Sequence, residues 1–177
     1  AEQLRTSGIE IFNHKAILRE IKSDDKCIFI SGNSTMSDVE ESETVFQYIP
    51  QIREWLKLFG SKPVRNRATV AGNIKNASPI ADFVNILLAL DAGLILQTNN
   101  GQRTIQLQNF YLGYKKVDIN ENEIISEIFF RIPNNNSLLS YEKISKRMYL
   151  DIATVNSTLI IAVKDNYVLN CRITAGG

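Results

Sequence analysis

The chain has one histidine, two cysteines and no long apolar run among its 177 residues. A catalytic Ser–His or Cys–His pair would have to use His14. That residue is far from any nucleophile-like motif, so we expect a solvated or capping histidine. No metal-ligand spacing is present. The longest apolar runs, residues 84–90 and 159–163, are much shorter than the ~20 residues that span a bilayer. We therefore expect no hydrolase triad, no metal site in this chain and no membrane span.

Excess charge of one sign is also absent, because the net charge is only +1. This balance argues against a nucleic-acid binder, since such proteins depend on neutralising phosphates. Hydrophobic residues are 44% and charged residues 22%, which is typical of a globular domain. Cys27 and Cys171 both lie in alternating apolar runs. We expect two free core thiols in a cytosolic protein, with a disulfide or a metal pair as the alternative. The polar start, residues 1–5, shows no signal peptide and agrees with a cytoplasmic location.

Helical periodicity dominates the first half of the chain. Ser37, with Glu40 three residues later, predicts a capping box at the start of one helix. Gly60 is a natural helix stop, and Pro79 suits the first turn of a helix. The predicted helices span residues 14–21, 39–45, 48–59 and 79–90.

Alternating apolar residues and turn signals mark strands, most of them in the second half. Asn99-Asn-Gly101 and Asp165-Asn166 are hairpin turns. Residues 110–114 read as a short helical turn. The predicted strands span residues 27–31, 94–98, 103–107, 123–132, 139–146, 153–163 and 167–174. Helices followed by antiparallel strands predict the α+β class, with helices on one face of a sheet, and disfavour a Rossmann fold.

Residues 65–82, Arg-Asn-Arg-Ala-Thr-Val-Ala-Gly-Asn-Ile-Lys-Asn-Ala-Ser-Pro-Ile-Ala-Asp, are the most informative part of the sequence. We call them the 65–82 segment and expect a loop from residue 65 to residue 79. Gly72 permits positive φ and a close approach of backbone to a ligand. The small neighbours Thr69, Ala71 and Asn73 leave peptide N–H groups free to point at a phosphate.

The second half of this segment adds polar groups next to a helix start. Asn73 and Asn76 tolerate left-handed geometry and offer amide donors. Ser78 can donate to a phosphate or cap the following helix, whose N-terminus favours anions. Asp82 can accept hydrogen bonds from sugar hydroxyls, or simply complement the helix dipole. The segment therefore predicts a phosphate or nucleotide site. A purely structural loop with an N-cap is the alternative, and Arg65 and Arg67 fit both.

The same segment, read from Phe59 to Asp82, closely resembles the second FAD-binding loop of the molybdenum hydroxylase flavoproteins. These are the FAD domain of xanthine dehydrogenases, whose small-subunit type is nearest, and the medium subunit of carbon monoxide dehydrogenases. The resemblance continues in order through Leu-Leu-Ala-Leu-Asp-Ala at residues 87–92 and Glu-Ile-Ile-Ser-Glu-Ile at 123–128. It extends through residues 141–147 and 150–156 to the Ala-Gly-Gly at 175–177, and so covers nearly the whole chain.

The resemblance implies a two-part α+β FAD-binding fold. FAD would take electrons from a 2Fe–2S cluster, supplied by a molybdenum cofactor on another domain or subunit, and pass them to NAD or another acceptor. Phe59 and Gly60 would lie near the adenine, Asp82 near ribityl or ribose hydroxyls, and Ile125 and Lys143 toward the isoalloxazine. The residues around the diphosphate and its sugar would be Thr69, Gly72, Asn73, Asn76 and Ser78, with Ala68 and Pro79 completing the set.

Two departures from the family pattern limit these expectations. The family also has a Gly-Gly-Thr-Asp loop upstream, which this chain lacks; Ser31-Gly-Asn-Ser-Thr-Met is a different turn. Ala71 replaces the first glycine of the usual Gly-Gly-Asn, which is acceptable if that position has negative φ. We expect residues 1–177 to be mainly the second FAD-binding subdomain, truncated at both ends and inactive alone. A small intact domain is the alternative.

Structural roles remain open for several of these residues. Phe59 lies on the apolar face of its helix, and Ile125 alternates with core residues of a strand. Lys143 alternates with Tyr141 and Ser145, which also fits a solvated sheet face. The rival to an electron-transferring flavoprotein is a cofactor-free interaction or structural domain that kept the fold and lost the flavin. A flavin enzyme with its own substrate is disfavoured, because no general base presents itself.

Overall fold

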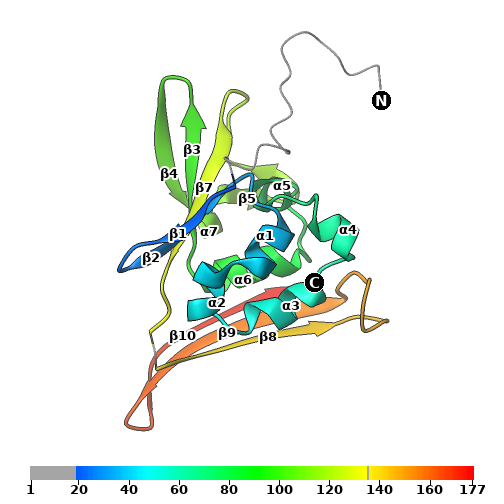
Figure 1. Ribbon diagram of the computed structural model, residues 1–177, viewed down its shortest axis with the longest axis vertical. Helices are drawn as coiled ribbons and strands as arrows, with labels where there is room; N and C mark the ends of the chain where they lie inside the picture. Colours follow the sequence, from blue (N-terminus) through cyan, green and yellow to red (C-terminus); the bar gives the residue numbers. More distant parts are fainter. Residues whose placement is uncertain (1–18, 135) are drawn as a thin grey trace.

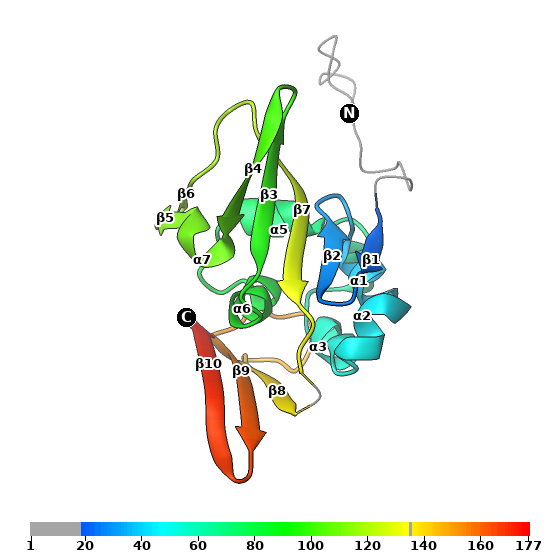
Figure 2. The ribbon, with the colours of Figure 1, turned by 90° about the vertical axis from the view of Figure 1, so that its left-hand side faces the viewer.

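Two antiparallel sheets with a layer of helices between them make up the protein (Figures 1 and 2). This computed structural model describes residues 19–134 and 136–177. The α+β class is therefore confirmed, but helices lie between two sheets rather than on one face of a single sheet. His14 and most of the helix predicted for 14–21 fall outside the described residues. Ile21 itself belongs to a strand, so the last part of that helix prediction is wrong.

The five-stranded sheet takes strands from both halves of the chain. Its order is β1 (Ile21–Ser23), β2 (Cys27–Ser31), β7 (Ile124–Arg131), β3 (Gly93–Thr98) and β4 (Gly101–Gln106). All neighbours are antiparallel, and the register places Ile30 opposite Ile128. Alternate residues of β2, β3 and β7, such as Ile28, Ile30 and Leu94, are fully buried against the helices, as period-two patterning predicts. The early strand β2 thus pairs with the late strand β7, which the sequence order alone did not predict.

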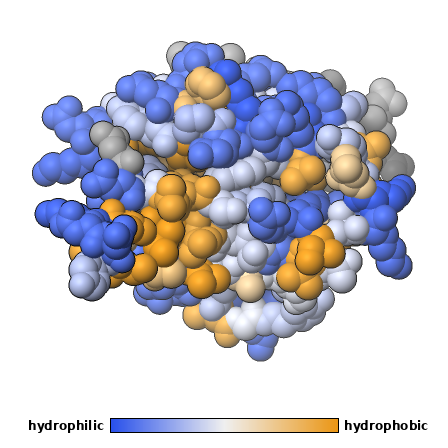
Figure 3. All heavy atoms as spheres, turned by 90° about the horizontal axis from the view of Figure 1, so that it is seen from below, coloured by the Kyte–Doolittle hydropathy of each residue, from blue (hydrophilic) through white to orange (hydrophobic). Residues whose placement is uncertain are grey.

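The second sheet is the hairpin-rich end of the chain. It has the order β10 (Tyr167–Gly176), β9 (Val155–Lys164) and β8 (Ser137–Ile144). The turn between β9 and β10 has φ values of 51° at Asp165 and 63° at Asn166, the left-handed pair that a tight hairpin requires. Its outer face carries exposed apolar side chains (Figure 3), and Cys171 is exposed on β10 rather than in the core. The cysteines are free, but the predicted core position is wrong for Cys171, and Cys27 is only half-buried.

The helical layer is built from short helices. They are α1 (Met36–Glu41), α2 (Glu43–Tyr48), α3 (Ile52–Lys57), α4 (Lys62–Arg65), α5 (Val70–Lys75), α6 (Asp82–Ala89) and α7 (Leu107–Phe110). A small ribbon, β5 (Tyr111–Gly113) and β6 (Lys116–Val117), follows α7, so the helical turn predicted for residues 110–114 is wrong beyond Phe110. The capping box of α1 uses Thr35 and Asp38 in place of the predicted Ser37 and Glu40. The predicted 48–59 helix is reduced to α3 and the end of α2.

Helix α6 is the centre of the core, with six of its eight residues buried between the two sheets. It begins at Asp82 rather than at Pro79, because residues 78–81 form a turn closed by Ala81 N–H donating to Ser78 O at 3.2 Å. Within the described part of the chain, no helix is long and apolar enough to cross a membrane.

Candidate functional site

The 65–82 segment contains the short helix α5 where a loop was predicted from residue 65 to 79. Helix α4 ends at Arg65, and α5 runs from Val70 to Lys75. Thr69 caps α5 by accepting a hydrogen bond from Gly72 N–H at 3.1 Å. Gly72 is needed for this close approach, since a Cβ there would lie 2.8 Å from Thr69 Oγ1, and it does not have positive φ. The left-handed residue is Ala77, with φ of 49°, and not one of the asparagines.

A turn after β2 packs directly against the start of α5. Val70 N–H donates to Ser34 O at 2.9 Å, and Ala71 N–H donates to Gly32 O at 3.0 Å. Gly32 N–H in turn donates to Ser126 O of β7 at 2.8 Å. A Cβ on Gly32 would meet the carbonyl oxygen of Ile125 at 2.1 Å, so only glycine fits between β7 and α5. We call residues 31–35 the Gly32 turn.

These bonds change how the segment can hold an anion. The N–H groups of Val70, Ala71 and Gly72 already have partners within the chain, and Asn73 N–H donates to Thr69 O at 3.0 Å. The predicted cradle of free peptide N–H groups at this point is therefore wrong. Recognition by this part of the segment has to use side chains and shape instead.

Two side-chain oxygen atoms at this junction are buried without a partner in the described part of the chain. The Asn73 Oδ1 acceptor and the Ser34 hydroxyl have no hydrogen-bond partner among the described residues, and Ser34 is fully buried. Buried polar atoms are normally satisfied, so each such atom calls for an explanation. A nucleotide cofactor has hydroxyl and amine groups that can donate to Asn73 Oδ1, and oxygen or nitrogen atoms that can accept from the Ser34 hydroxyl. The residues present therefore fit FAD.

Asn76, Ser78 and Pro79 lie apart from this junction. Ser78 and Pro79 line a largely apolar pocket of about 380 Å³ together with Tyr111, Tyr114 and Lys115. Lys115 Nζ donates to Asn76 O at 3.1 Å, which ties the β5–β6 ribbon to the end of α5. Burial raises the pKa of the Tyr111 phenol, whose hydroxyl donates to Ile74 O at 3.2 Å. The predicted diphosphate set is therefore divided between the start of α5 and the residues that follow its end.

Asp82 and Lys143 form a buried ion pair with an Nζ–Oδ2 distance of 2.6 Å. Asp82 Oδ1 also accepts from Tyr141 Oη at 2.7 Å and Asn156 Nδ2 at 2.9 Å. Burial, and then the Asp82 charge and hydrogen bond, raise the pKa of the Tyr141 phenol. The alternative of a solvated sheet face is wrong for Lys143, whose side chain is 3% exposed.

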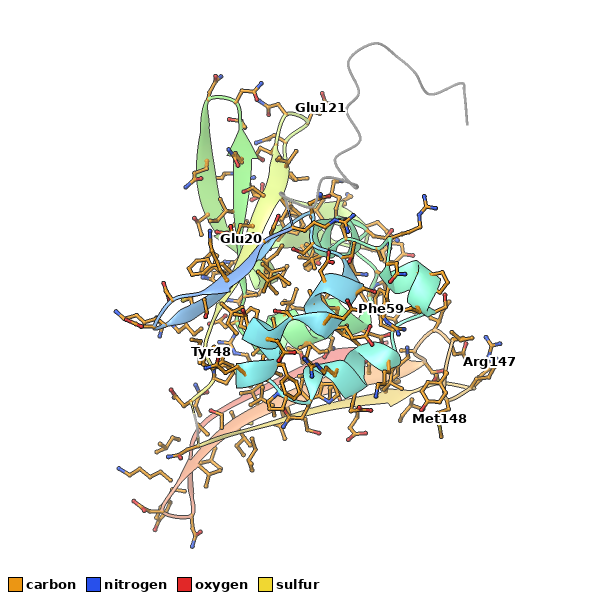
Figure 4. All side chains as sticks on the ribbon, in the orientation of Figure 1. Glu20, Tyr48, Phe59, Glu121, Arg147 and Met148 are labelled. Atoms are coloured by element: carbon orange, nitrogen blue, oxygen red, sulfur yellow. The ribbon has the colours of Figure 1, made fainter. Side chains whose placement is uncertain are left out.

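Phe59 and Gly60 lie between α3 and α4 in the helical layer (Figure 4). Gly60 has φ of 50°, as expected after a helix end. The carbonyl oxygens of both residues accept from Arg65 Nη1, at 3.1 and 3.2 Å. Arg65 is buried and pairs with Glu40 at 2.8 Å, so it is part of the interior rather than a solvated loop edge.

The structure thus brings some predicted residues together and separates others. Thr69 pairs with Thr35 of the Gly32 turn, and Gly72 and Asn73 follow it in α5, whose first residues bond to this turn beside the buried Ile125 of β7. Asp82 meets Lys143, which also reaches Leu58 O, next to Phe59, at 2.8 Å. Sequence reasoning missed Gly32, Ser34, Tyr141 and Asn156. The strand-then-glycine pattern at Gly32 was a usable signal, whereas the other three depend on long-range pairing.

Comparisons with known proteins agree with this arrangement. A family model described as the FAD binding domain in molybdopterin dehydrogenase matches residues 9–134. Xanthine dehydrogenase of Blastobotrys adeninivorans is 33% identical over 165 residues, covering 86% of this chain and 12% of that protein. The carbon monoxide dehydrogenase medium chain of Hydrogenophaga pseudoflava is 31% identical over 158 residues, covering 88% of this chain and 54% of that one.

A solved structure gives the same result for the fold. Carbon monoxide dehydrogenase from Hydrogenophaga pseudoflava superposes with a TM-score of 0.84 and 28% identity, covering 90% of this chain and 55% of that chain. This chain therefore spans about half the length of that medium chain and a much smaller part of the xanthine dehydrogenase.

Proposed function

Because the chain belongs to the family of FAD-binding domains of molybdopterin dehydrogenases, we propose that it is the electron-transferring FAD part of a xanthine dehydrogenase-like molybdenum hydroxylase. In this proposal electrons from a 2Fe–2S cluster reach NAD or another acceptor by way of FAD. The iron–sulfur and molybdenum-cofactor domains or subunits are its partners, and it is inactive without them. The proposed location is the cytoplasm.

The observation that carries the proposal is the pair of unsatisfied buried atoms at the Gly32 turn and α5. Asn73 Oδ1 and Ser34 Oγ have no partner among the described residues, although the N–H groups of Gly32, Ser34, Val70 and Ala71 are all hydrogen-bonded. The backbone N–H groups at this junction have partners within the chain, whereas these two side-chain groups do not. A ligand that supplies hydrogen-bond partners for both groups would fit here. FAD, when bound, supplies reversible two-electron chemistry.

We propose that different residues of the chain contact different parts of FAD, as the family resemblance implies. Thr69, Gly72, Asn73, Asn76 and Ser78, with Ala68 and Pro79, surround the diphosphate and its sugar. Phe59 and Gly60 lie toward the adenine, and their carbonyls are fixed by Arg65. Ile125 is a buried residue of β7 beside Gly32 and shields the flavin ring from water.

Absorbance of the purified protein tests the proposal. We expect absorption in the flavin bands, release of FAD on denaturation, and regain of those bands when FAD is returned to the refolded protein. A colourless protein that cannot be reconstituted, either as this chain or with its iron–sulfur and molybdenum partners, would refute it.

One observation favours a second candidate, a cofactor-free interaction or structural domain. The first N–H groups of α5 are satisfied within the chain, so the segment does not need a ligand to keep its shape. This candidate predicts the same stability with and without FAD. The flavoprotein predicts that FAD raises the midpoint of thermal unfolding, as any ligand that binds only the folded state does.

A further inference from the structure

The β9–β10 hairpin is longer than the helix on which it packs. Helix α6 ends at Ala89, and the ion pair between Asp91 and Arg172, with Oδ1 and Nη1 2.5 Å apart, places that end beside the middle of β10. The hairpin turn, between Lys164 and Tyr167, lies further on. The tip of the hairpin therefore extends past the helical layer (Figures 1 and 2).

A groove of about 780 Å³ lies between this part of the hairpin and one end of the five-stranded sheet. Ala162 and Asn170 line the hairpin side, and Cys27 and Arg131 line the other side. Both are register pairs, so each wall is one face of a sheet. We call this space the hairpin groove. None of its lining residues belongs to the 65–82 segment or the Gly32 turn, so it is separate from the candidate FAD site.

The hairpin groove has an unpaired cation on each wall. Arg131 is exposed on β7 and has no ion pair within the described part of the chain. Lys164, which is exposed and likewise unpaired there, follows Ala162 by two residues on β9 and so points to the same face. Among the described lining residues the only acid is Asp91, which already pairs with Arg172. The groove is therefore complementary to a ligand that carries carboxylates.

The dimensions of the groove suit a short piece of extended chain. It reaches from Gln106, at the end of the edge strand β4, to Cys27 on β2. Because β3 and β7 lie between these strands, the length is three strand spacings, or roughly 14 Å, which holds about four extended residues. The volume divided by this length gives a cross-section of roughly 55 Å². That is close to one extended strand, ~4.8 Å by ~10 Å, and smaller than an α-helix of ~10–12 Å diameter.

We propose that the hairpin groove binds an extended acidic segment of a partner polypeptide. Its carboxylates pair with Arg131 and Lys164, and an apolar side chain between them packs on Phe129 and Ile160, which also line the groove. FAD plays no part in this binding, because the groove and the candidate FAD site share no residue.

The test is a selection of random heptapeptides displayed on phage, with the immobilised protein as the target. We expect the enriched peptides to carry Asp or Glu on both sides of an apolar residue. Fluorescence anisotropy of one labelled peptide then gives its Kd. Arg131→Glu/Lys164→Glu should raise this Kd by at least about tenfold. Ala162→Leu fills the groove without changing its charge and should raise the Kd by a similar factor.

The matched control is Lys57→Glu/Lys62→Glu, which changes the net charge equally at exposed side chains of α3 and α4. Its Kd should stay within about twofold of the unchanged protein, and circular dichroism checks that every variant is folded. Arg131→Gln/Lys164→Gln replaces the charge-reversed variant if that one unfolds.

Three results would overturn the acidic-segment site. They are a selection that enriches no acidic peptide, a Kd that neither Arg131→Glu/Lys164→Glu nor Ala162→Leu changes, and a Kd that the control raises as much as they do. Displacement of the labelled peptide by an equal concentration of succinate would also overturn it, since the groove would then bind a small acid rather than a chain.

Discussion

Gly32→Ala should push the Gly32 turn away from β7 and α5, because no side chain fits at Gly32. An added Cβ would lie 2.1 Å from the carbonyl oxygen of Ile125 and 3.1 Å from Ala71 Cβ. The first contact is with backbone, so either β7 or the turn has to move by roughly an ångström. That movement strains the bonds from Gly32 N–H to Ser126 O and from Ala71 N–H to Gly32 O, which are 2.8 and 3.0 Å long. Overpacking of this kind typically costs about 1–3 kcal/mol, and the backbone clash places this site at the upper end.

The assay is thermal unfolding followed by circular dichroism, together with FAD affinity at a temperature where the variant is folded. A loss of about 3 kcal/mol lowers the midpoint by roughly 10 °C in a chain of this size. We also expect weaker FAD binding, since Ser34 moves with the turn. Gly177→Ala is the control, because its Cβ would meet only ordinary contacts at 3.5 and 3.7 Å. If Gly32→Ala unfolds and binds FAD like this control, the account of the junction is wrong.

Three further predictions concern single side chains. Asn73→Leu should raise the Kd for FAD by about tenfold but leave the free energy of unfolding unchanged or higher, because it removes a buried acceptor that lacks a partner among the residues the structure describes. Equal affinity in fluorescence titration would contradict this. Arg65→Met removes the guanidinium from Glu40, which keeps only Lys62 at 3.5 Å, and from the carbonyls of Phe59 and Gly60. It should cost about 3 kcal/mol in urea unfolding, part of it recovered when Glu40→Gln is added; no recovery would show that the pair is not coupled. A hydrogen bond from Arg103 lowers the pKa of Glu123 to about 2, so its stabilising effect is complete above its ordinary pKa of 4.5 and is lost as the pH falls toward 2. Urea midpoints of Glu123→Gln and the unchanged protein should therefore differ at pH 7 and converge near pH 2, and a constant difference would refute the assignment.

Local pattern was enough to predict most of the elements. The strand at Cys27–Ser31 and the later strands were predicted within one or two residues at most boundaries, because period-two alternation is strong there. Helices α4 and α5 were missed, since they have only four and six residues and lie among glycine and asparagine. Their stability comes from caps by Ser61 and Thr69 and from tertiary bonds to the Gly32 turn, which no local rule encodes.

The candidate site, too, was only partly predictable from local sequence. The 65–82 segment was found from residue types and from its resemblance to a family. The pairing of Asp82 with Lys143 was not, because it joins residues 61 positions apart and depends on how β8 packs against α6. A lysine alternating with polar residues on a strand reads as solvated until its buried partner is known. Ser34 was likewise hidden, since an isolated serine in a turn carries no signal of burial.

The central claim is that FAD binds where the Gly32 turn meets α5, and amide hydrogen exchange measured with and without FAD tests it most directly. We expect added FAD to slow exchange in residues 31–36 and 68–78, while residues 164–170 at the far end of the β9–β10 hairpin stay unchanged. Unchanged exchange throughout, or protection confined to segments away from this junction, would contradict the account.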